Sequence, residues 1–268
     1  MTAREIPSIE TAGTQTISRA VEVLACFSAE RPHLKLAELA SQLGLTQSTA
    51  YRYLTALESG GLVSRDPSQG GYRLGHKVIE LAWIALNQIE ARKHALDEME
   101  QLLQETGLKI NLAVLFEGDV IHIAHAVPPD VPRVLTTPGR RAVAHCTSLG
   151  KAMIADLPTE QVHAMVERYG WRPYTKASIS DFERLDRELE HIREVGYALD
   201  LRERRPEVLC AGAPIRDYSG RVVAAVSASV RDNRFTAESL EAEIAPRVMA
   251  AAERISFRMG DQATAAFL

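Results

Sequence analysis

The sequence predicts an α+β protein in two parts, an N-terminal winged helix-turn-helix domain over residues 16–76 and a C-terminal domain over residues 93–268. Two helical patterns separated by a glycine and followed by a β-hairpin pattern predict the first part. Apolar strand-like runs mixed with helical patterns predict a mainly antiparallel sheet with helices in the second part. A linker helix is expected over residues 77–92, and the polar residues 1–15 are expected to be a disordered tail.

Composition is that of a globular protein, with 46% hydrophobic and 25% charged residues in a chain of 268. No apolar run approaches the roughly 18 residues that a membrane span needs. The first residues lack the basic-then-apolar pattern of a signal peptide. The three cysteines, Cys26, Cys146 and Cys210, are too few and too scattered for a disulfide framework or a zinc site. We therefore expect a cytoplasmic protein that makes no membrane contact.

Three helices are predicted before residue 60. Apolar residues spaced by three and four mark the first two helices, at Ile17–Phe27 and Leu36–Leu43, and Gly44 ends the second. Thr46 is placed to cap the third helix, whose residues Ala50, Tyr53, Leu54 and Leu57 share one face. Ser48, Tyr51, Arg52 and Thr55 lie almost opposite. This pattern favours a DNA-reading helix; a helical hairpin inside some other domain is the alternative.

Two strand-like runs, Leu62–Arg65 and Gly71–Leu74, surround a turn rich in Asp, Pro, Ser and Gly and predict the wing. Residues 45–77 are mildly basic, although the net charge of the chain is -4. Arginine can bond a guanine edge, and hydroxyls can bond bases or phosphate. Arg65 and Arg73 could instead form surface ion pairs. The candidate DNA-binding residues are Thr46, Gln47, Ser48, Thr49, Tyr51, Arg52, Thr55, Arg65 and Arg73.

The segments "TISRAVEVLACF", "LKLAELASQLGLTQSTAYRYLTALESGGLVSRD" and "GYRLGHKVIELA" resemble the N-terminal domain of the IclR family of bacterial transcriptional regulators. The chain departs from the family at Tyr51 and Tyr53, where His and Leu are more frequent. These departures bear on which DNA sequence is read. The resemblance implies binding to double-stranded DNA at a near-palindromic operator by a homo-oligomer, either a dimer or a dimer of dimers.

The predicted linker helix is apolar around most of its girth, from Val78 to Ile89, with Trp83 on a second apolar side. Such a helix must be buried on several sides, against a partner subunit or within its own chain. The resemblance favours a dimerising linker.

The second half begins with a predicted helix at Ala91–Glu105, followed by a hairpin around residues 117–119 and a short strand, "RVLTT", at 133–137. The resemblance implies a GAF-like effector-binding domain. The remaining expected elements are helices at Leu149–Ala155, Thr159–Tyr169, Asp181–Val195 and Thr236–Met259, and strands at Leu209–Ile215 and Arg221–Val230.

The strand "VVAAVSASV" places Ser227 and Ser229 on one face, where their hydroxyls could line a pocket or simply fill a tight or solvated surface. The segment "HCTSLGKAMIA" lacks the spacing of a phosphate-binding loop, but its helix N-terminus could hold a carboxylate. The resemblance implies a small carboxylate effector, with the amides of Gly150 and Lys151 at its site. The expected effector-binding residues are Leu149, Gly150, Lys151, Asp200, Cys210, Ser227 and Ser229.

An enzyme is the alternative: a GAF-type small-molecule module with hydrolase-like or other signalling activity. Asp200, Cys210 and His145 are the residue types of a Cys-His-Asp hydrolase, but Cys210 lies in an apolar strand and no G-x-S-x-G motif is present. His122 and His125, three apart on a strand, are expected on opposite faces, which argues against a metal pair. We therefore expect no catalytic residue, metal site or cofactor. The effector, a short aliphatic or an aromatic acid, and the sign of regulation stay open.

Overall fold

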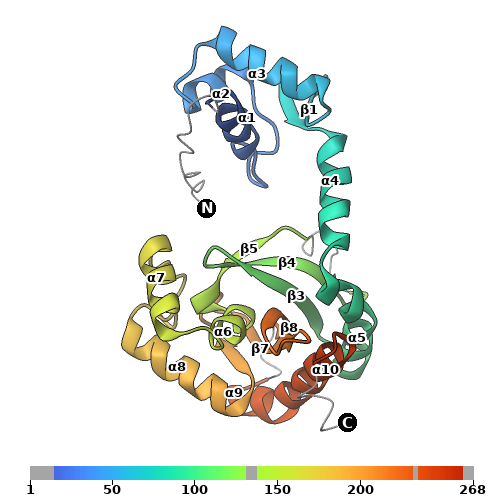
Figure 1. The fold of residues 1–268 in the computed structure, drawn as a ribbon, viewed down its shortest axis with the longest axis vertical. Helices are drawn as coiled ribbons and strands as arrows, with labels where there is room; N and C mark the ends of the chain where they lie inside the picture. Colours follow the sequence, from blue (N-terminus) through green and yellow to red (C-terminus); the bar gives the residue numbers. More distant parts are fainter. Residues whose placement is uncertain (1–14, 131–137, 232–234, 262–268) are drawn as a thin grey trace. The chain divides into compact units, whose positions relative to one another are not determined.

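The computed structural model describes residues 15–130, 138–231 and 235–261 (Figure 1). The chain divides into two compact units, Met1–Gln88 and Ile89–Leu268, each described by itself. The predicted tail, apart from Gln15, and the predicted strand at 133–137 lie outside the described residues. None of the described helices is long and apolar enough to cross a membrane.

The first unit is a helix-turn-helix followed by a hairpin, as predicted. Leu54 of the third helix is fully buried against Val23 of the first and Leu39 of the second. Ala40 is also buried, which allows the second and third helices to cross closely. The elements are α1 (Gln15–Ala25), α2 (Leu36–Gln42), α3 (Gln47–Ser59), β1 (Val63–Arg65), β2 (Tyr72–Leu74) and α4 (His76–Asn87).

The wing is anchored to the helices through a third backbone segment. Ser64 pairs with Arg73 in the antiparallel hairpin, and Tyr72 exchanges two backbone hydrogen bonds of 2.8 and 2.9 Å with Leu34. Gly71 has φ of +130°, and a Cβ there would lie 2.7 Å from the Leu34 carbonyl oxygen. Only glycine fits this close approach, so the turn sequence fixes the position of the wing.

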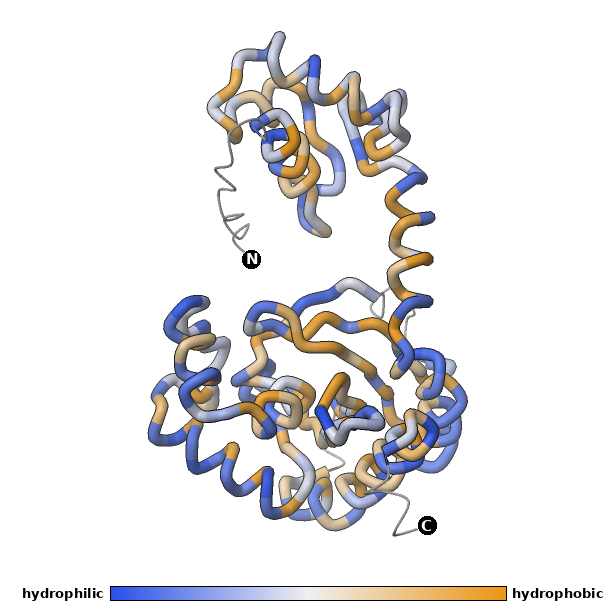
Figure 2. Tube along the Cα trace, viewed as in Figure 1, coloured by the Kyte–Doolittle hydropathy of each residue, from blue (hydrophilic) through white to orange (hydrophobic). Residues whose placement is uncertain are grey.

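Helix α4 buries none of its side chains within the described chain. Its residues are apolar along much of its length (Figure 2). Ile79 and Trp83 are 73% and 68% exposed, and Leu81 and Ile84 are also exposed. The alternative that this helix packs within its own chain therefore has no support from its contacts in the described structure.

The second unit is built on a six-stranded, fully antiparallel sheet in the order β5-β4-β3-β8-β7-β6. This confirms the predicted antiparallel sheet. The strands β5 and β6 at its two edges were not among the predicted strands. The strands are β3 (Lys109–Phe116), β4 (Asp119–Ala126), β5 (Arg141–Val143), β6 (Ala198–Leu201), β7 (Leu209–Arg216) and β8 (Val222–Val230).

Helices α5 (Glu90–Thr106) and α10 (Ala245–Arg258) pack together on one face of this sheet (Figure 1). Glu98 of α5 is 2% exposed and is held by Arg254 and Arg258 of α10 at 2.6 and 2.7 Å. The helix predicted over Thr236–Met259 is divided into α9 (Ala237–Ser239), a π-helical segment η3 (Leu240–Ile244) and α10. Pro246 lies in the first turn of α10, where its missing N–H favours this change of hydrogen-bond pattern.

The other face of the sheet carries α6 (Ser148–Ile154), which packs on α8 (Phe182–Val195). The 3₁₀ turn η2 (Ala144–Cys146) precedes α6, and α7 (Thr159–Tyr169) lies beyond it. Gly150 permits this arrangement, because a Cβ there would lie 2.2 Å from the Ala144 carbonyl oxygen. The first turn of α6 is therefore fixed against η2, at one end of the sheet's polar face.

Candidate functional site

The outward face of α3 carries the hydroxyl, aromatic and arginine side chains that the sequence predicted. Gln47, Ser48, Tyr51, Arg52 and Thr55 are exposed, while the opposite face is buried. No hydrogen bond or ion pair within the described parts of the chain occupies the Arg52 guanidinium. Its donors are available to an external acceptor, as a base-reading arginine requires.

The start of α3 is held by a cluster of three hydroxyls. Thr46 caps the helix by accepting the Thr49 N–H at 3.2 Å, and its Oγ1 lies 3.0 Å from Ser48 Oγ and 2.9 Å from Thr49 Oγ1. Thr55 donates its hydroxyl to the Tyr51 carbonyl at 2.9 Å. The hydroxyls of Thr46, Ser48 and Thr49 therefore lie together at the N-terminus of the helix, an arrangement that suits a phosphate.

The two wing arginines differ in their surroundings. Arg65 donates to Glu58 at 3.3 Å and to the Tyr51 hydroxyl at 3.4 Å, which joins the wing to α3. The surface ion pair considered for Arg65 is thus present. Arg73 is exposed on the other arm and has no such pair within the described chain.

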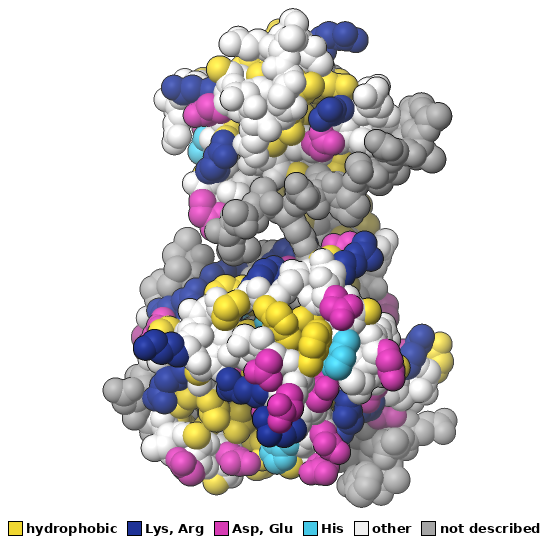
Figure 3. All heavy atoms as spheres, turned by 90° about the vertical axis from the view of Figure 1, so that its left-hand side faces the viewer, with side chains coloured by type: hydrophobic (Ala, Val, Ile, Leu, Met, Phe, Trp, Pro, Cys, Tyr) yellow, Lys and Arg dark blue, Asp and Glu magenta, His cyan; other side chains and the backbone are white. Residues whose placement is uncertain are grey.

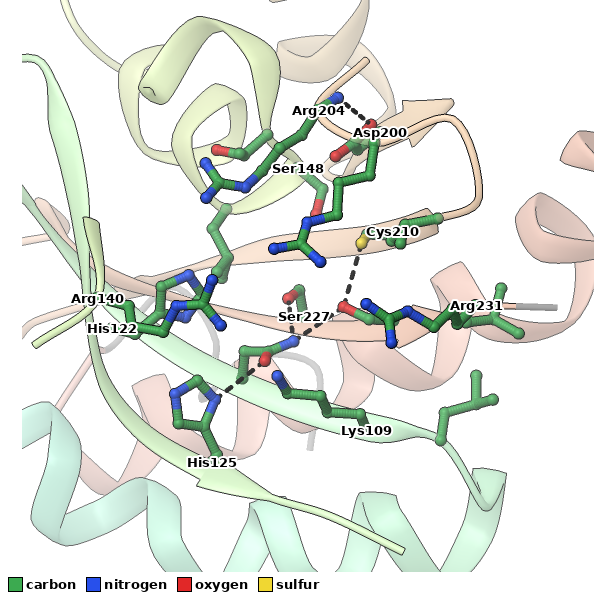
Figure 4. A pocket seen from close by; sticks show the side chains of 18 of the residues that line it. Lys109, His122, His125, Arg140, Ser148, Asp200, Arg204, Cys210, Ser227 and Arg231 are labelled. Atoms are coloured by element: carbon green, nitrogen blue, oxygen red, sulfur yellow. Dashed lines mark hydrogen bonds between the residues drawn. The ribbon is translucent and has the colours of Figure 1, made fainter. Parts of the chain in front are cut away.

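The second unit contains a cavity of about 640 Å³ whose floor is the polar face of the sheet (Figure 4). Five strands supply two adjacent rows of residues in register. One row runs His125, Asn111, Ser227, Gly212; the other runs Lys109, Ser229, Cys210, Asp200. The predicted residues Asp200, Cys210, Ser227 and Ser229 therefore lie together at the cavity.

A chain of hydrogen bonds orders this floor. Asn111 Nδ2 donates to Ser229 Oγ at 2.9 Å and to Ser227 Oγ at 3.3 Å, while its Oδ1 lies 3.0 Å from His125 Nδ1. Cys210 Sγ lies 3.1 Å from Ser229 Oγ. Because Asn111 fixes both serines, their remaining hydrogen-bonding capacity is held ready for a ligand.

The start of α6 and the loop after β6 cover the floor. Thr147, Ser148 and Leu149 line the cavity from α6, and Arg204 and Arg205 line it from the loop. Gly212 allows α6 to come this close, since a Cβ there would lie 3.0 Å from the Ser148 carbonyl carbon. Leu149 is thus found at the cavity as predicted.

Gly150 and Lys151 are not brought to the cavity. The Gly150 N–H donates to Thr147 Oγ1 at 3.2 Å and the Lys151 N–H to the Thr147 carbonyl at 2.9 Å, so both amides are used inside α6. The Lys151 side chain is 1% exposed and bridges Glu188 and Glu203, each at 2.6 Å. The two carboxylates outweigh the effect of burial and hold the pKa of Lys151 above its usual value.

The cavity is strongly cationic. Burial and the neighbouring Arg140 lower the pKa of Lys109 to about 8. Burial and the nearby Glu203 raise the pKa of Asp200 to about 7. The charged lining residues are Lys109, Arg140, Arg204, Arg205 and Arg231 against Asp130 and Asp200. None of these cations was predicted from the sequence, because they come from segments up to 122 residues apart whose proximity only the sheet order reveals.

The prediction that His122 and His125 point to opposite faces is wrong. Leu112 pairs with Ala124 and Ala113 with His122, so a β-bulge inserts Ile123 as an extra residue. The two rings stack with centroids 5.1 Å apart, and both line the cavity. Burial lowers the pKa of His122 to about 3. Over the described residues, no group of three His, Cys, Asp or Glu side chains could hold a metal ion.

The hydrolase-like residues are not assembled into a catalytic group. Burial raises the pKa of the Cys210 thiol to about 12, which disfavours the reactive thiolate. His145 does not line the cavity; it is buried in an edge-on contact with Trp171, with ring centroids 5.0 Å apart. His145 is therefore not placed to act as the base that activates the Cys210 thiol.

A winged helix-turn-helix on one unit and a polar cavity on the other define a DNA-binding regulator with a separate effector-binding domain. Family models agree: residues 16–67 match the IclR helix-turn-helix domain, and residues 84–257 match the bacterial transcriptional regulator IclR C-terminal domain. The chain belongs to the IclR family of bacterial transcriptional regulators.

Curated relatives are named as transcriptional regulators rather than enzymes. HTH-type transcriptional regulator Rv1719 of Mycobacterium tuberculosis is 36% identical over 89% of this chain and 90% of its own length. XynR of Escherichia coli is 30% identical over 82% of this chain and 87% of its own. Among solved structures, IclR of Thermotoga maritima is 28% identical with a TM-score of 0.72, covering 91% of this chain and 98% of that chain.

Proposed function

We propose that this regulator's occupancy of a near-palindromic operator is controlled by a small organic acid bound in the cavity of the second unit, in the cytoplasm. The observation that carries the proposal is the cavity itself. It combines hydroxyl donors fixed by Asn111 with a lining in which cations outnumber carboxyls. Such a lining favours an anionic ligand, and charge-assisted hydrogen bonds to a carboxylate are about twice as strong as neutral ones.

A thermal-shift and calorimetry screen of the full chain tests the acid. The panel contains short aliphatic and aromatic carboxylates, each beside its methyl ester and its primary amide. We expect at least one acid to raise the melting temperature while its ester and amide do not. If the neutral analogues stabilised the protein as well as the acids, the assignment to an organic acid would be wrong.

Control of DNA binding requires that the acid bind the two quaternary arrangements of the protein with different affinity. We propose that α4 transmits this difference, because it follows the wing directly and ends where the second unit begins. Gel-shift titrations with and without the stabilising acid show whether the acid strengthens or weakens operator binding. An acid that bound tightly but left the operator affinity unchanged would contradict this control.

Dimerisation through α4 is a separate prediction. The exposed apolar side chains of this helix match a second copy of the same helix, and two subunits would present two α3 helices to a two-fold operator. Trp83→Glu should convert the dimer to a monomer at micromolar concentration, as measured by light scattering after gel filtration. Gln88→Glu places the same charge at the exposed end of α4 and should leave the mass unchanged. An unaltered dimer in Trp83→Glu would place the interface elsewhere.

Acid binding should weaken as the pH rises. Lys109 loses its charge above about pH 8, and Asp200 gains a negative charge above about pH 7, so both changes disfavour an anion in the same direction. A carboxylic acid with a pKa near 4 stays ionised throughout, and His122 stays neutral. We expect affinity to fall about tenfold between roughly pH 6.5 and roughly pH 8.5, measured by calorimetry. Lys109→Met should lower the affinity at the acidic end and flatten the profile; a flat profile in the wild type would contradict the prediction.

A further inference from the structure

The cavity holds more positive charge than one carboxylate can balance. Five cationic side chains line it beside only two carboxyls. The outer surface of the same unit is different: on the face that carries α7 and α8, acidic and basic side chains are interspersed (Figure 3). The excess of cations in the cavity is therefore not shared by this outer face.

The described part of the chain leaves some of these cations without an ionic partner. Within the described residues, Lys109 Nζ and the Arg205 guanidinium have no hydrogen-bond or ion-pair partner. Arg231 reaches only Glu207, at 3.9 Å on the surface. The low pKa of Lys109 has mutual repulsion among these cations as one of its causes. Cations gathered around one cavity repel one another, and an anion bound among them relieves this repulsion.

Arg204 provides the second, independent observation. Its Nη1 is buried and has no hydrogen-bond partner among the described residues, although Nη2 donates to the Arg141 carbonyl at 3.5 Å and the guanidinium lies 5.2 Å from the centre of the Tyr174 ring. A buried donor left without an acceptor is energetically unfavourable. Its neighbours orient the Arg204 side chain, and the Nη1 donor is left available to a ligand.

Lys109 and Arg204 lie on different walls of the cavity. Lys109 projects from β3 beside Ser229, whereas Arg204 comes from the loop after β6, and Figure 4 shows them on opposite sides with Arg140 between. One carboxylate can pair with one of these groups. The volume of about 640 Å³ lies within the range of sites that enclose a small organic ligand, which leaves room for a second anionic group.

We propose that the effector is a dianion, with one anionic group at Lys109, Ser227 and Ser229 and a second anionic group at Arg204. This inference rests on the proposed binding of an organic acid and narrows its class. A dicarboxylate or an acid carrying a phosphate ester meets the requirement, because both present two separated anionic groups. A monocarboxylate leaves the Arg204 donor unpaired and the remaining charge uncompensated.

The test compares ligands that differ by one charge and little else. Calorimetry on the full chain measures terephthalate, its monomethyl ester, 4-carboxyphenyl phosphate and benzoate, and repeats the comparison with glutarate and its monomethyl ester. We expect a dianion to bind at least about tenfold more tightly than its monoanionic partner, since one charge-assisted bond is gained. Tighter binding of the phosphate compound would identify a phosphate ester as the second group.

Two variants locate the second anion. Arg204→Gln should reduce the preference for the dianion to about twofold and leave the affinity for the monoester nearly unchanged, whereas Arg204→Lys should keep part of the preference. Arg187→Gln, which removes a charge from an exposed pair on α8, is the matched control. If the wild type bound dianions and monoanions with equal affinity, the proposal of a dianionic effector would be wrong. The proposal of an organic acid would be unaffected. Absence of binding by every acid would overturn both.

Discussion

Replacing Lys151 by methionine should lower the free energy of unfolding of the second unit by about 3–5 kcal/mol, the cost typical of removing one partner of a buried ion pair. The side chain is 1% exposed, and its removal leaves the 5% exposed Glu203 and the partly exposed Glu188 facing each other. Denaturation by urea, followed by Trp171 fluorescence in a Trp83→Phe background, measures this loss.

The pH dependence and a double variant show how much of the stability lost in Lys151→Met comes from charge and how much from packing. Without Lys151, the folded-state pKa of Glu203 rises further above its unfolded value, because burial and Glu188 already raise it. The deficit should therefore be complete above the folded pKa and shrink as the pH falls toward about 4. Adding Glu203→Gln to Lys151→Met should recover part of the stability. A single variant that lost less than about 1 kcal/mol would show that the ion pairs matter little.

Lys151 also shows what the sequence could not reveal. Its position after a glycine at a helix start predicted an amide at the effector, but its ionic partners lie 37 and 52 residues further along the chain. A buried lysine is recognised only when both carboxylates are seen beside it. The glycine has an explanation of its own: Gly150 is needed for close packing of α6 on η2.

The fold was far more predictable than the cavity. Apolar spacing and glycine positions predicted the helices α1 to α8 and the central strands, because these patterns are local. The edge strand β5 has only three residues and shows no usable alternation. Ser227 and Ser229 were found because alternation places them on one face. Lys109, Asn111 and Arg204 were missed because only strand register and loop position bring them to the serines.

The histidine pair shows how a single residue changes a prediction. Strict alternation separates residues three apart, and one bulged residue, Ile123, reverses the parity. Nothing in the local sequence of β4 marks the bulge. The same bulge brings His122 into the cavity, so an irregularity in the strand determines part of the lining.

The second large effect is expected at Arg52. Arg52→Ala should reduce the ratio of affinities for operator and unrelated DNA by about 10- to 100-fold for each half-site, since one bidentate arginine–guanine pair contributes about 1–3 kcal/mol of discrimination. The premise is the exposed, unengaged guanidinium on the outer face of α3. Competition gel shifts with DNA from upstream of the protein's own gene measure the ratio at fixed salt concentration.

The controls distinguish reading a base from attracting phosphate. Arg52→Lys keeps the charge but loses the bidentate geometry, so it should lose most of the discrimination as well. Arg73→Ala, on the exposed arm of the wing, should weaken operator and unrelated DNA equally and reduce the salt dependence by about one charge per subunit. Ser229→Ala, in the cavity, should leave operator binding without effector unchanged and blunt the response to the acid. An equal loss on both DNAs in Arg52→Ala would reassign Arg52 to the phosphate backbone, and Tyr51 would then be the side chain on α3 to test for base recognition.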